Sequence, residues 1–352
     1  MSHQQRSSRS HIKSSPARAA RLALGILVAA VATPRAGAVS APAAAARAPE
    51  DDAAQPLWME MRDVRLHVDA SAVMRVVDLR GEAVPTKPGA VVVLDDPRSF
   101  AIQVSGGTVA LDGEGLSALM NEIVFAYHGA PIRHLRIRIT DSTLVQSGVL
   151  HKGVDLPFTM VTTVALTPDK RIRVHPTSMR LLGIDGEKLM RALGLHLKNL
   201  LDVRGAHGVA VDGDDLLLDP LQMLPPPAVR GDVAAARVEH GVMQLEFTRT
   251  PADSVFGSYV RPDSGVTNFV YFRGGRLRFG RLEMRDTDLL ISDGNAADPF
   301  DLYLAHYAEQ LSAGYSRTMP NAALRVVMPD WRVVAQGRSV PPPAVPVTVG
   351  ER

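Results

Sequence analysis

The chain has 352 residues, of which 46% are hydrophobic, enough for one large domain or two ordinary ones with a sizeable core. It contains no cysteine, which excludes disulfide bonds, thiol catalysis and thiolate metal sites. Residues 1–38 hold six Lys and Arg and no acid, which leaves 33 basic against 37 acidic residues in the remainder. A mildly acidic remainder argues against nucleic acid as a partner, since binding phosphates requires a basic patch.

The N-terminal segment is typical of a secretory signal peptide. Five basic residues lie within residues 1–21, an unbroken apolar run follows at 22–32, and Ala36-Gly37-Ala38 offers a small-x-small cleavage site. The apolar run is shorter than the roughly 20 residues that a membrane-spanning helix needs. We therefore expect residues 1–38 to be a signal peptide and the protein to be exported to the periplasm or cell envelope. An uncleaved anchor is the alternative.

Composition also predicts the limits of the folded part. Residues 39–55 are rich in Ala and Pro, which indicates a disordered linker. Residues 337–352 contain three consecutive prolines at 341–343 and are predicted to form a disordered tail. Residues 56–336 are then expected to form a single domain.

Alternating apolar residues predict strands over much of that domain. In residues 62–69, Val64 and Leu66 share one face, and in residues 133–140, Leu135 and Ile137 do the same. Further strand-like runs, separated by Pro, Gly or Asp, occupy residues 91–94, 100–104, 108–111, 143–150, 157–166 and 171–175. Hairpins are predicted at residues 209–218, 233–247 and 269–284, the last turning at Gly274-Gly275.

Three segments have helical spacing instead. The first covers residues 115–128 and ends before Gly129, a natural C-cap. The second covers residues 186–201, and the third covers residues 299–312 after Asp298 as N-cap.

A weak internal repeat links the two ends of the domain. Residues 59–63 (Met-Glu-Met-Arg-Asp) and 282–286 (Leu-Glu-Met-Arg-Asp) are nearly identical, and residues 137–141 resemble them. Each motif ends in Asp and leads into another apolar stretch, which indicates a bulge or kink within one long strand. Coincidence between short β segments is the alternative.

No catalytic or metal-binding motif stands out. The 11 histidines show no metal-ligand spacing, and Asp212-Gly213-Asp214-Asp215 lacks the length and distal Glu of an EF-hand loop, so a polar hairpin turn is favoured there. Nucleophile-elbow, Walker and dinucleotide motifs are absent, and no pair of carboxylates is singled out. We therefore expect a protein that is not an enzyme and that carries neither cofactor nor metal.

Apolar surface is the remaining candidate feature. If the helices do not close fully on the sheet, a groove for acyl chains would remain between them, although such helices more often simply pack on their sheet. The candidates for the lipid pocket are Met120, Ile123, Val124, Tyr127, Phe158, Met160, Leu189, Leu193 and Leu197. Arg136 and Arg138 are candidates for binding a lipid headgroup, with a solvated strand face as the alternative.

Residues 114–247 also contain an ordered set of motifs. In chain order they are the helix at 115–128, the strands at 133–148, Lys152–Phe158, Ile172–Pro176, the helix at 189–201, Gly208-Val209, Asp219-Pro220, Leu224–Pro227 and Gly231. This order resembles the LmeA-like phospholipid-binding proteins of bacterial envelopes and, more distantly, the tubular lipid-binding (TULIP) superfamily. The resemblance implies a long curved antiparallel sheet that wraps a helix and encloses an apolar channel.

Together these observations predict an α+β protein with one elongated, strongly curved antiparallel sheet wrapped around two or three helices, TULIP-like in fold. The predicted function is non-enzymatic binding, with transfer as an option, of a phospholipid or other acyl lipid. Transient contact with a membrane surface is compatible with this function, and protein partners are left open. The alternatives are an envelope scaffold with a closed core and a glycan or lipid hydrolase whose carboxylates the sequence does not identify.

Overall fold

The computed structural model describes residues 55–68, 70–185, 201–257 and 265–342, and the account below refers to them. The predicted signal peptide, most of the linker, nearly all of the second predicted helix and the end of the tail lie outside these residues. With 53% strand and 11% helix, the protein is β-rich, as the sequence predicts. No helix in the described ranges has the length and apolar character needed to cross a membrane.

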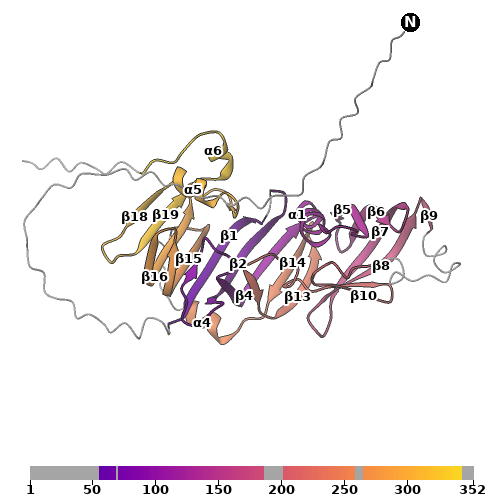
Figure 1. The fold of residues 1–352 in the computed structure, drawn as a ribbon, viewed down its shortest axis with the longest axis horizontal. Coiled ribbons are helices and arrows are strands. Elements are labelled where there is room, and N and C mark those ends of the chain that lie inside the picture. Colours follow the sequence, from indigo (N-terminus) through magenta and orange to yellow (C-terminus); the bar gives the residue numbers. More distant parts are fainter. Residues whose placement is uncertain (1–54, 69, 186–200, 258–264, 343–352) are drawn as a thin grey trace, which may run out of the picture. The chain divides into compact units, whose positions relative to one another are not determined.

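The larger sheet has twelve strands and is strongly curled. Neighbouring strands along its main path are antiparallel except β16 and β19, and the path runs β13-β14-β4-β2-β1-β15-β16-β19-β18 (Figure 1). The strands on this path are β1 (Leu57–His67), β2 (Val73–Pro85), β4 (Phe100–Asp112), β13 (Val233–Glu239), β14 (Val242–Phe247), β15 (Phe269–Phe279), β16 (Leu282–Asp293), β18 (Tyr315–Thr318) and β19 (Leu324–Met328). Three short strands join it in parallel: β3 (Val92–Val93) on β15, β12 (Ala228–Arg230) on β4, and β17 (Phe300–Tyr303) on β1.

The remaining strands form a second, antiparallel sheet of seven strands. Its path runs β10-β11-β8-β7-β6-β5, with β9 beside β8. The strands are β5 (Ile132–Ile139), β6 (Leu144–His151), β7 (Asp155–Leu166), β8 (Ile172–Leu181), β9 (Ile184–Asp185), β10 (Val209–Asp212) and β11 (Asp215–Leu218). The prediction of one continuous sheet is therefore wrong, because the strands divide between two.

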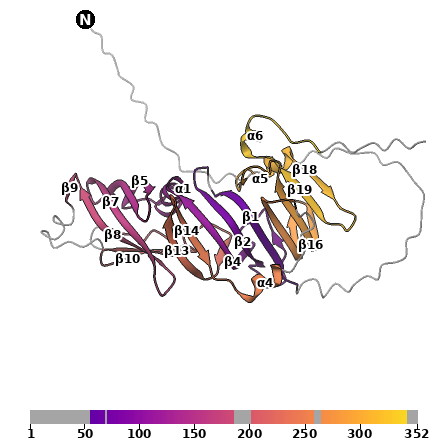
Figure 2. The ribbon, with the colours of Figure 1, turned by 180° about the vertical axis from the view of Figure 1, so that it is seen from behind.

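Five short helical segments accompany the sheets in the described residues. They are α1 (Gly113–Ala118), η1 (Leu119–Val124), α4 (Pro251–Gly257), α5 (Tyr307–Ala313) and α6 (Trp331–Ala335). Both views show α1 beside β5, and α5 and α6 beside β18 and β19 (Figures 1 and 2). The first predicted helix thus corresponds to α1 and η1. It begins after Asp112, whose carboxylate accepts a hydrogen bond from the Gly115 N–H at 2.8 Å.

Side chains of this helix occupy the free edge of β5, which explains why the smaller sheet ends there. The Ile137 N–H donates to the Ser117 hydroxyl at 2.8 Å. The Asn121 amide accepts from the Leu135 N–H at 2.9 Å and donates to the Leu135 carbonyl at 2.7 Å. Because Ser117 and Asn121 are one helical turn apart, they satisfy backbone groups that a neighbouring strand would otherwise bind.

Two glycines let α1 approach both sheets. A Cβ atom on Gly113 would lie 2.5 Å from the Ile137 carbonyl oxygen of β5. A Cβ atom on Gly115 would lie 2.3 Å from the Val73 carbonyl oxygen of β2. Real side chains do not approach that closely, so the helix backbone itself is packed between the two sheets.

The repeated motif does mark a kink in two long strands. Asp63 in β1 and Asp286 in β16 both have φ of 47°, and each strand continues beyond its Asp. Both strands pair with β15, so the two motifs flank the same strand. The third occurrence differs, because Asp141 lies in the turn after β5.

Two local predictions are wrong. Gly274 and Gly275 lie inside β15 and are not the hairpin turn; Gly275 has φ of 48° and lies opposite the kink at Asp286. The third predicted helix is a strand in its first part, because fully buried Phe300 begins β17 and pairs with Val64 of β1. Burial in the core outweighs the helical spacing there.

One main hydrophobic core includes residues of both sheets and of the helix between them. Leu277 and Leu289 of the larger sheet are completely buried, Ile172 of the smaller sheet is 1% exposed, and Leu116 of α1 is 3% exposed. The inward faces of both sheets therefore contribute to one apolar interior.

Candidate functional site

Alternation along β7 and β8 gives the smaller sheet one apolar face. Phe158 and Met160 lie opposite Leu181 and Met179 across the β7–β8 pair. Thr177 is an extra residue in β8, where the pairing with β7 shifts by one position. Because of this shift, Val174 and Pro176 before it lie on the same face of the sheet as Met179 and Leu181 after it. The strand thus remains apolar on one side along its whole length.

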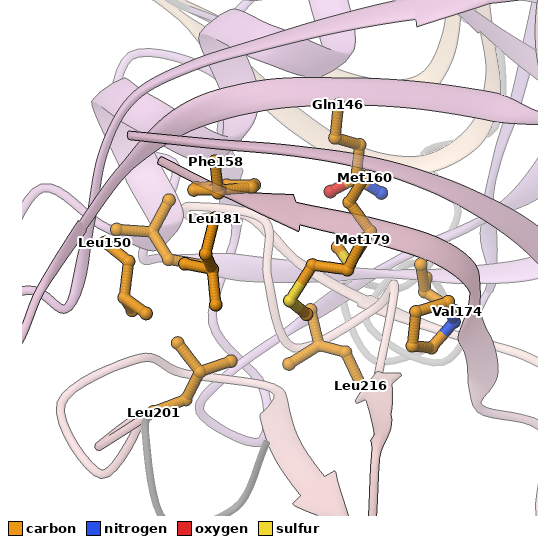
Figure 3. Close-up of a pocket in the computed structure, with 11 residues that line it drawn as sticks. Gln146, Leu150, Phe158, Met160, Val174, Met179, Leu181, Leu201 and Leu216 are labelled. Atoms are coloured by element: carbon orange, nitrogen blue, oxygen red, sulfur yellow. The ribbon is translucent and has the colours of Figure 1, made fainter. Parts of the chain in front are cut away.

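The β7 hollow is the first of three apolar hollows along the inward faces. It has a volume of about 560 Å³, counting space open to solvent. It is lined by Ile132, Gln146, Leu150, Phe158, Met160, Val174, Pro176, Met179, Leu181, Leu201 and Leu216 (Figure 3). Among these, Gln146 alone carries a polar group, and its amide donates to the Thr162 hydroxyl at 3.0 Å.

The α1 hollow lies where the helix meets both sheets. Its volume is about 830 Å³, again including space open to solvent, and its described lining is wholly apolar. The lining residues are Met74, Val76, Leu79, Ile102, Val109, Leu111, Leu116, Leu119, Ile172, Leu218, Pro220, Leu221, Met223, Leu224, Val229, Met243, Leu245 and Phe247.

The β15 hollow lies on the larger sheet and has a volume of about 940 Å³ on the same basis. It is lined by Met59, Met61, Leu66, Leu94, Asp95, Pro97, Phe100, Ile102, Pro227, Val270, Phe272, Phe279, Ile291, Leu302, Leu304, Tyr307 and Met328. Asp95 is the one charged residue in this described lining.

The three hollows follow one another along a continuous apolar surface. Ile102 lines both the α1 hollow and the β15 hollow. Val174 lines the β7 hollow while Ile172, two residues earlier on the same face of β8, lines the α1 hollow. Leu216 and Leu218 of β11 bridge the same two hollows.

The structure places the predicted pocket residues in three different situations. Phe158 and Met160 line the β7 hollow. The four candidates on the first predicted helix belong to the hydrophobic core or pack against it, and none of them lines one of these three hollows: Met120, Ile123, Val124 and Tyr127. The three candidates on the second predicted helix lie outside the described residues: Leu189, Leu193 and Leu197.

Tyr127 shows how the end of the first helical segment is fixed. Its hydroxyl donates to the Asp202 carbonyl at 3.3 Å, and its ring packs so closely on Gly205 that a Cβ there would lie 2.5 Å away. Burial, together with the negative charge of Asp202, raises the pKa of Tyr127. The residue is therefore an anchor between the helix and the segment that precedes β10.

The two arginines predicted to bind a headgroup point away from the hollows. Arg136 and Arg138 are exposed on β5, whereas the alternating Leu135 and Ile137 are buried. They occupy the solvated face of the strand, which is the alternative to headgroup binding given in the sequence analysis.

Sequence reasoning missed most of the residues that line the α1 and β15 hollows. Alternation identifies the strands at β4, β14 and β15, but the shared lining arises from pairing between segments more than 100 residues apart, such as β1 with β15. Periodicity describes one strand at a time and does not specify its neighbour. The alternating Met59 and Met61 are the signal that an inward face begins there.

Comparison with protein families, curated proteins and solved structures finds no match to this chain. The resemblance to the LmeA-like proteins and to the tubular lipid-binding superfamily therefore stays a prediction. The argument for a function rests on the geometry of the hollows.

Proposed function

We propose that the protein binds an acyl lipid without chemical turnover, and that it does so in the periplasm or cell envelope. The observation that carries this proposal is the continuity of the β7, α1 and β15 hollows along one apolar surface. A series of such hollows suits a long, flexible apolar ligand better than a compact one.

The chemistry of the lining favours a lipid chain over a peptide. A bound peptide brings an amide N–H and C=O with every residue, and each needs a hydrogen-bond partner when it leaves water. The described lining offers three polar side chains: Gln146, already bonded to Thr162, in the β7 hollow, and Asp95 and Tyr307 in the β15 hollow. An acyl chain needs no such partners.

The expected energetics are sufficient for useful binding. Each methylene transferred from water to an apolar site contributes roughly 0.8 kcal/mol, so about twelve buried methylenes contribute roughly 10 kcal/mol. Association and ordering cost about 4–15 kcal/mol, so this gain leaves a net favourable free energy of binding where the cost lies in the lower part of that range. A phospholipid with one or two chains is therefore a suitable ligand class, and its headgroup would lie outside the apolar lining.

A matched pair of variants on β7 tests the proposal. Met160→Arg places a charge in the β7 hollow, whereas Thr159→Arg places the same charge on the exposed opposite face one residue away. The full chain should be purified from its native compartment and its organic extract analysed by mass spectrometry. We expect stoichiometric lipid with the wild type and Thr159→Arg, and at least a tenfold loss with Met160→Arg.

Circular dichroism would show whether Met160→Arg remains folded. Should that variant unfold, Met179→Gln on the facing strand provides a milder polar change in the same hollow. Wild-type protein that is reproducibly free of lipid, and that takes up none from vesicles containing a labelled phospholipid, would contradict the proposal. Such a result would favour the envelope scaffold with a closed core.

A further inference from the structure

Strand pairing brings three aspartates together at one end of the larger sheet. Asp293 ends β16, Asp298 lies in the connection to β17, and Asp330 lies between β19 and α6. The parallel pairing of β16 with β19 sets Asp293 opposite Met328, and the Gly294 N–H donates to the Met328 carbonyl at 2.8 Å. Residues more than 30 positions apart in the chain thus meet at the carboxyl ends of two adjacent strands.

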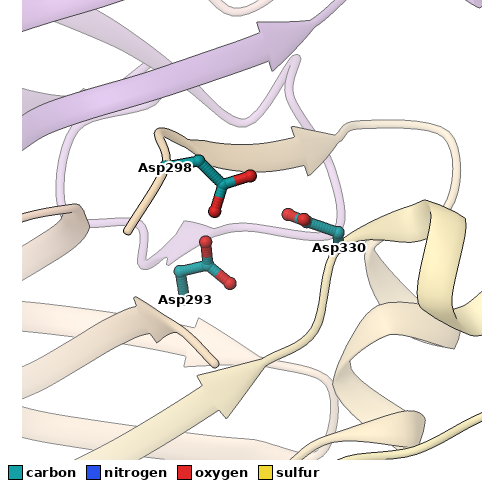
Figure 4. Close-up of side chains that lie close together, drawn as sticks. All are labelled: Asp293, Asp298 and Asp330. Atoms are coloured by element: carbon teal, nitrogen blue, oxygen red, sulfur yellow. The ribbon is translucent and has the colours of Figure 1, made fainter. Parts of the chain in front are cut away.

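The three carboxylates point toward one another (Figure 4). One oxygen of each lies within 4.8 Å of the others. Asp293 and Asp330 are each 8% exposed, and Asp298 is partly buried. In the part of the chain that the structure describes, none of the three forms an ion pair, so their negative charges are close together without a cation.

Asp330 adds a second observation, because one of its carboxylate oxygens lacks a hydrogen-bond partner among the described residues. It occupies the N-cap position of α6, where an Asp side chain normally accepts a hydrogen bond from the first helical turn, yet it makes no such bond. Its Oδ1 atom is buried and has no hydrogen-bond partner in the described structure. A buried acceptor left in this way is costly, unless a cation or proton occupies the space it faces.

Neighbouring cations neutralise a different carboxylate. Asp301 bonds to His67 at 2.8 Å and lies 3.6 Å from the Arg65 guanidinium and 3.8 Å from that of Arg332. These groups pair with Asp301 and leave the three clustered aspartates uncompensated.

We infer that Asp293, Asp298 and Asp330 form a binding site for a divalent cation that prefers oxygen ligands, of the type of Ca²⁺. Carboxylate oxygens are the ligands that Ca²⁺ takes at about 2.3–2.6 Å, so one ion can contact three oxygens that all lie within 4.8 Å of one another. Mg²⁺ requires shorter distances and near-octahedral geometry, and Zn²⁺ prefers nitrogen and sulfur ligands. The bound ion would fasten the connection between β16 and β17 to the junction of β19 and α6.

Calcium binding by the full chain tests this site directly. The protein is stripped with EDTA and titrated with CaCl₂ alone, followed by isothermal calorimetry and by thermal unfolding. We expect one ion bound per chain and a melting temperature raised by about 3 °C or more. Asp330→Asn should weaken binding at least tenfold, while Asp141→Asn, an exposed aspartate in the turn after β5, should bind as the wild type does.

The stripped Asp330→Asn variant should itself fold, because the change removes one of three mutually repelling charges. If it does not, Asp298→Asn, whose side chain is less buried, provides the same comparison. Absence of heat and of a melting shift at millimolar Ca²⁺ would overturn the inference. A cluster variant that binds Ca²⁺ as tightly as the wild type would also overturn it, as would a stronger response of the wild type to Zn²⁺ than to Ca²⁺.

Discussion

Replacing Asn121 by Ala tests the claim that the first helical segment closes the edge of β5. The Asn121 amide pairs with both the N–H and the C=O of Leu135, and Leu135 is 3% exposed. The substitution leaves these two backbone groups without their partner, and each unsatisfied group costs about 1–3 kcal/mol. Because Asn121 itself is only partly buried and water can reach part of the gap, we expect a loss of about 2–4 kcal/mol in the free energy of unfolding.

Urea denaturation followed by circular dichroism measures this loss. Glu122→Ala is the matched control, since Glu122 is exposed on the next position of the same helix and should change stability by no more than about 0.5 kcal/mol. Asn121→Asp keeps the acceptor for the Leu135 N–H but removes the donor to the Leu135 carbonyl. We therefore expect its free energy of unfolding to be lower than that of the wild type. An Asn121→Ala variant as stable as Glu122→Ala would refute the idea that the helix replaces a missing strand.

Two further predictions concern the core and pH. Phe300→Ala should cost about 3–5 kcal/mol in urea unfolding, because the completely buried ring joins β17 to β1 in the main core. Burial raises the pKa of Glu82 above its ordinary value of 4.5, so the folded protein binds a proton there more readily than the unfolded chain does. The stability of the fold therefore falls as the pH rises from 4.5 through the raised pKa of the folded state. Glu82→Gln should therefore melt higher than the wild type at pH 7 and match it well below pH 4.5; equal curves throughout would contradict this.

The strands of the smaller sheet were the most predictable part of the fold. Residues 133–140 alternate strictly and residues 157–166 form a strand-like apolar run, and the structure forms β5 and β7 there. The turn at Asp212–Asp215 also forms as predicted, with Gly213 at φ of 61°. In these segments local pattern and tertiary burial agree, so the sequence alone is sufficient.

Other parts of the fold depended on contacts that a local pattern does not contain. A Gly274-Gly275 pair is compatible both with a hairpin turn and with a kink inside a long strand. The pairing of β15 with β16 on both sides of the two glycines shows that they form the kink. Residues 299–303 follow a good N-cap yet form a strand, because β1 offers Phe300 a buried position. Sequence separation, more than residue type, limited the prediction in both cases.

The candidate site was predictable in its chemistry and less so in its location. The apolar neighbours of Phe158 and Met160 made these two residues pocket candidates from the sequence, and both line the β7 hollow. The aspartates at 293, 298 and 330 were missed because the first two lie at the end of β16 and in the connection that follows it, while the third follows a different strand. The Asp293-Gly294-Asn295 sequence was the one local feature that could have drawn attention to this cluster.

Gly113 and Gly115 have a consequence for what the molecule can accommodate. Their bare backbones set the distance between β5 and β2, since either hydrogen replaced by a methyl group would press on a carbonyl oxygen of one strand. Leu116 and Leu119, which follow directly, line the α1 hollow. The helix therefore acts as a spacer of fixed thickness, and the width of the α1 hollow beside it is set by two positions that carry no side chain.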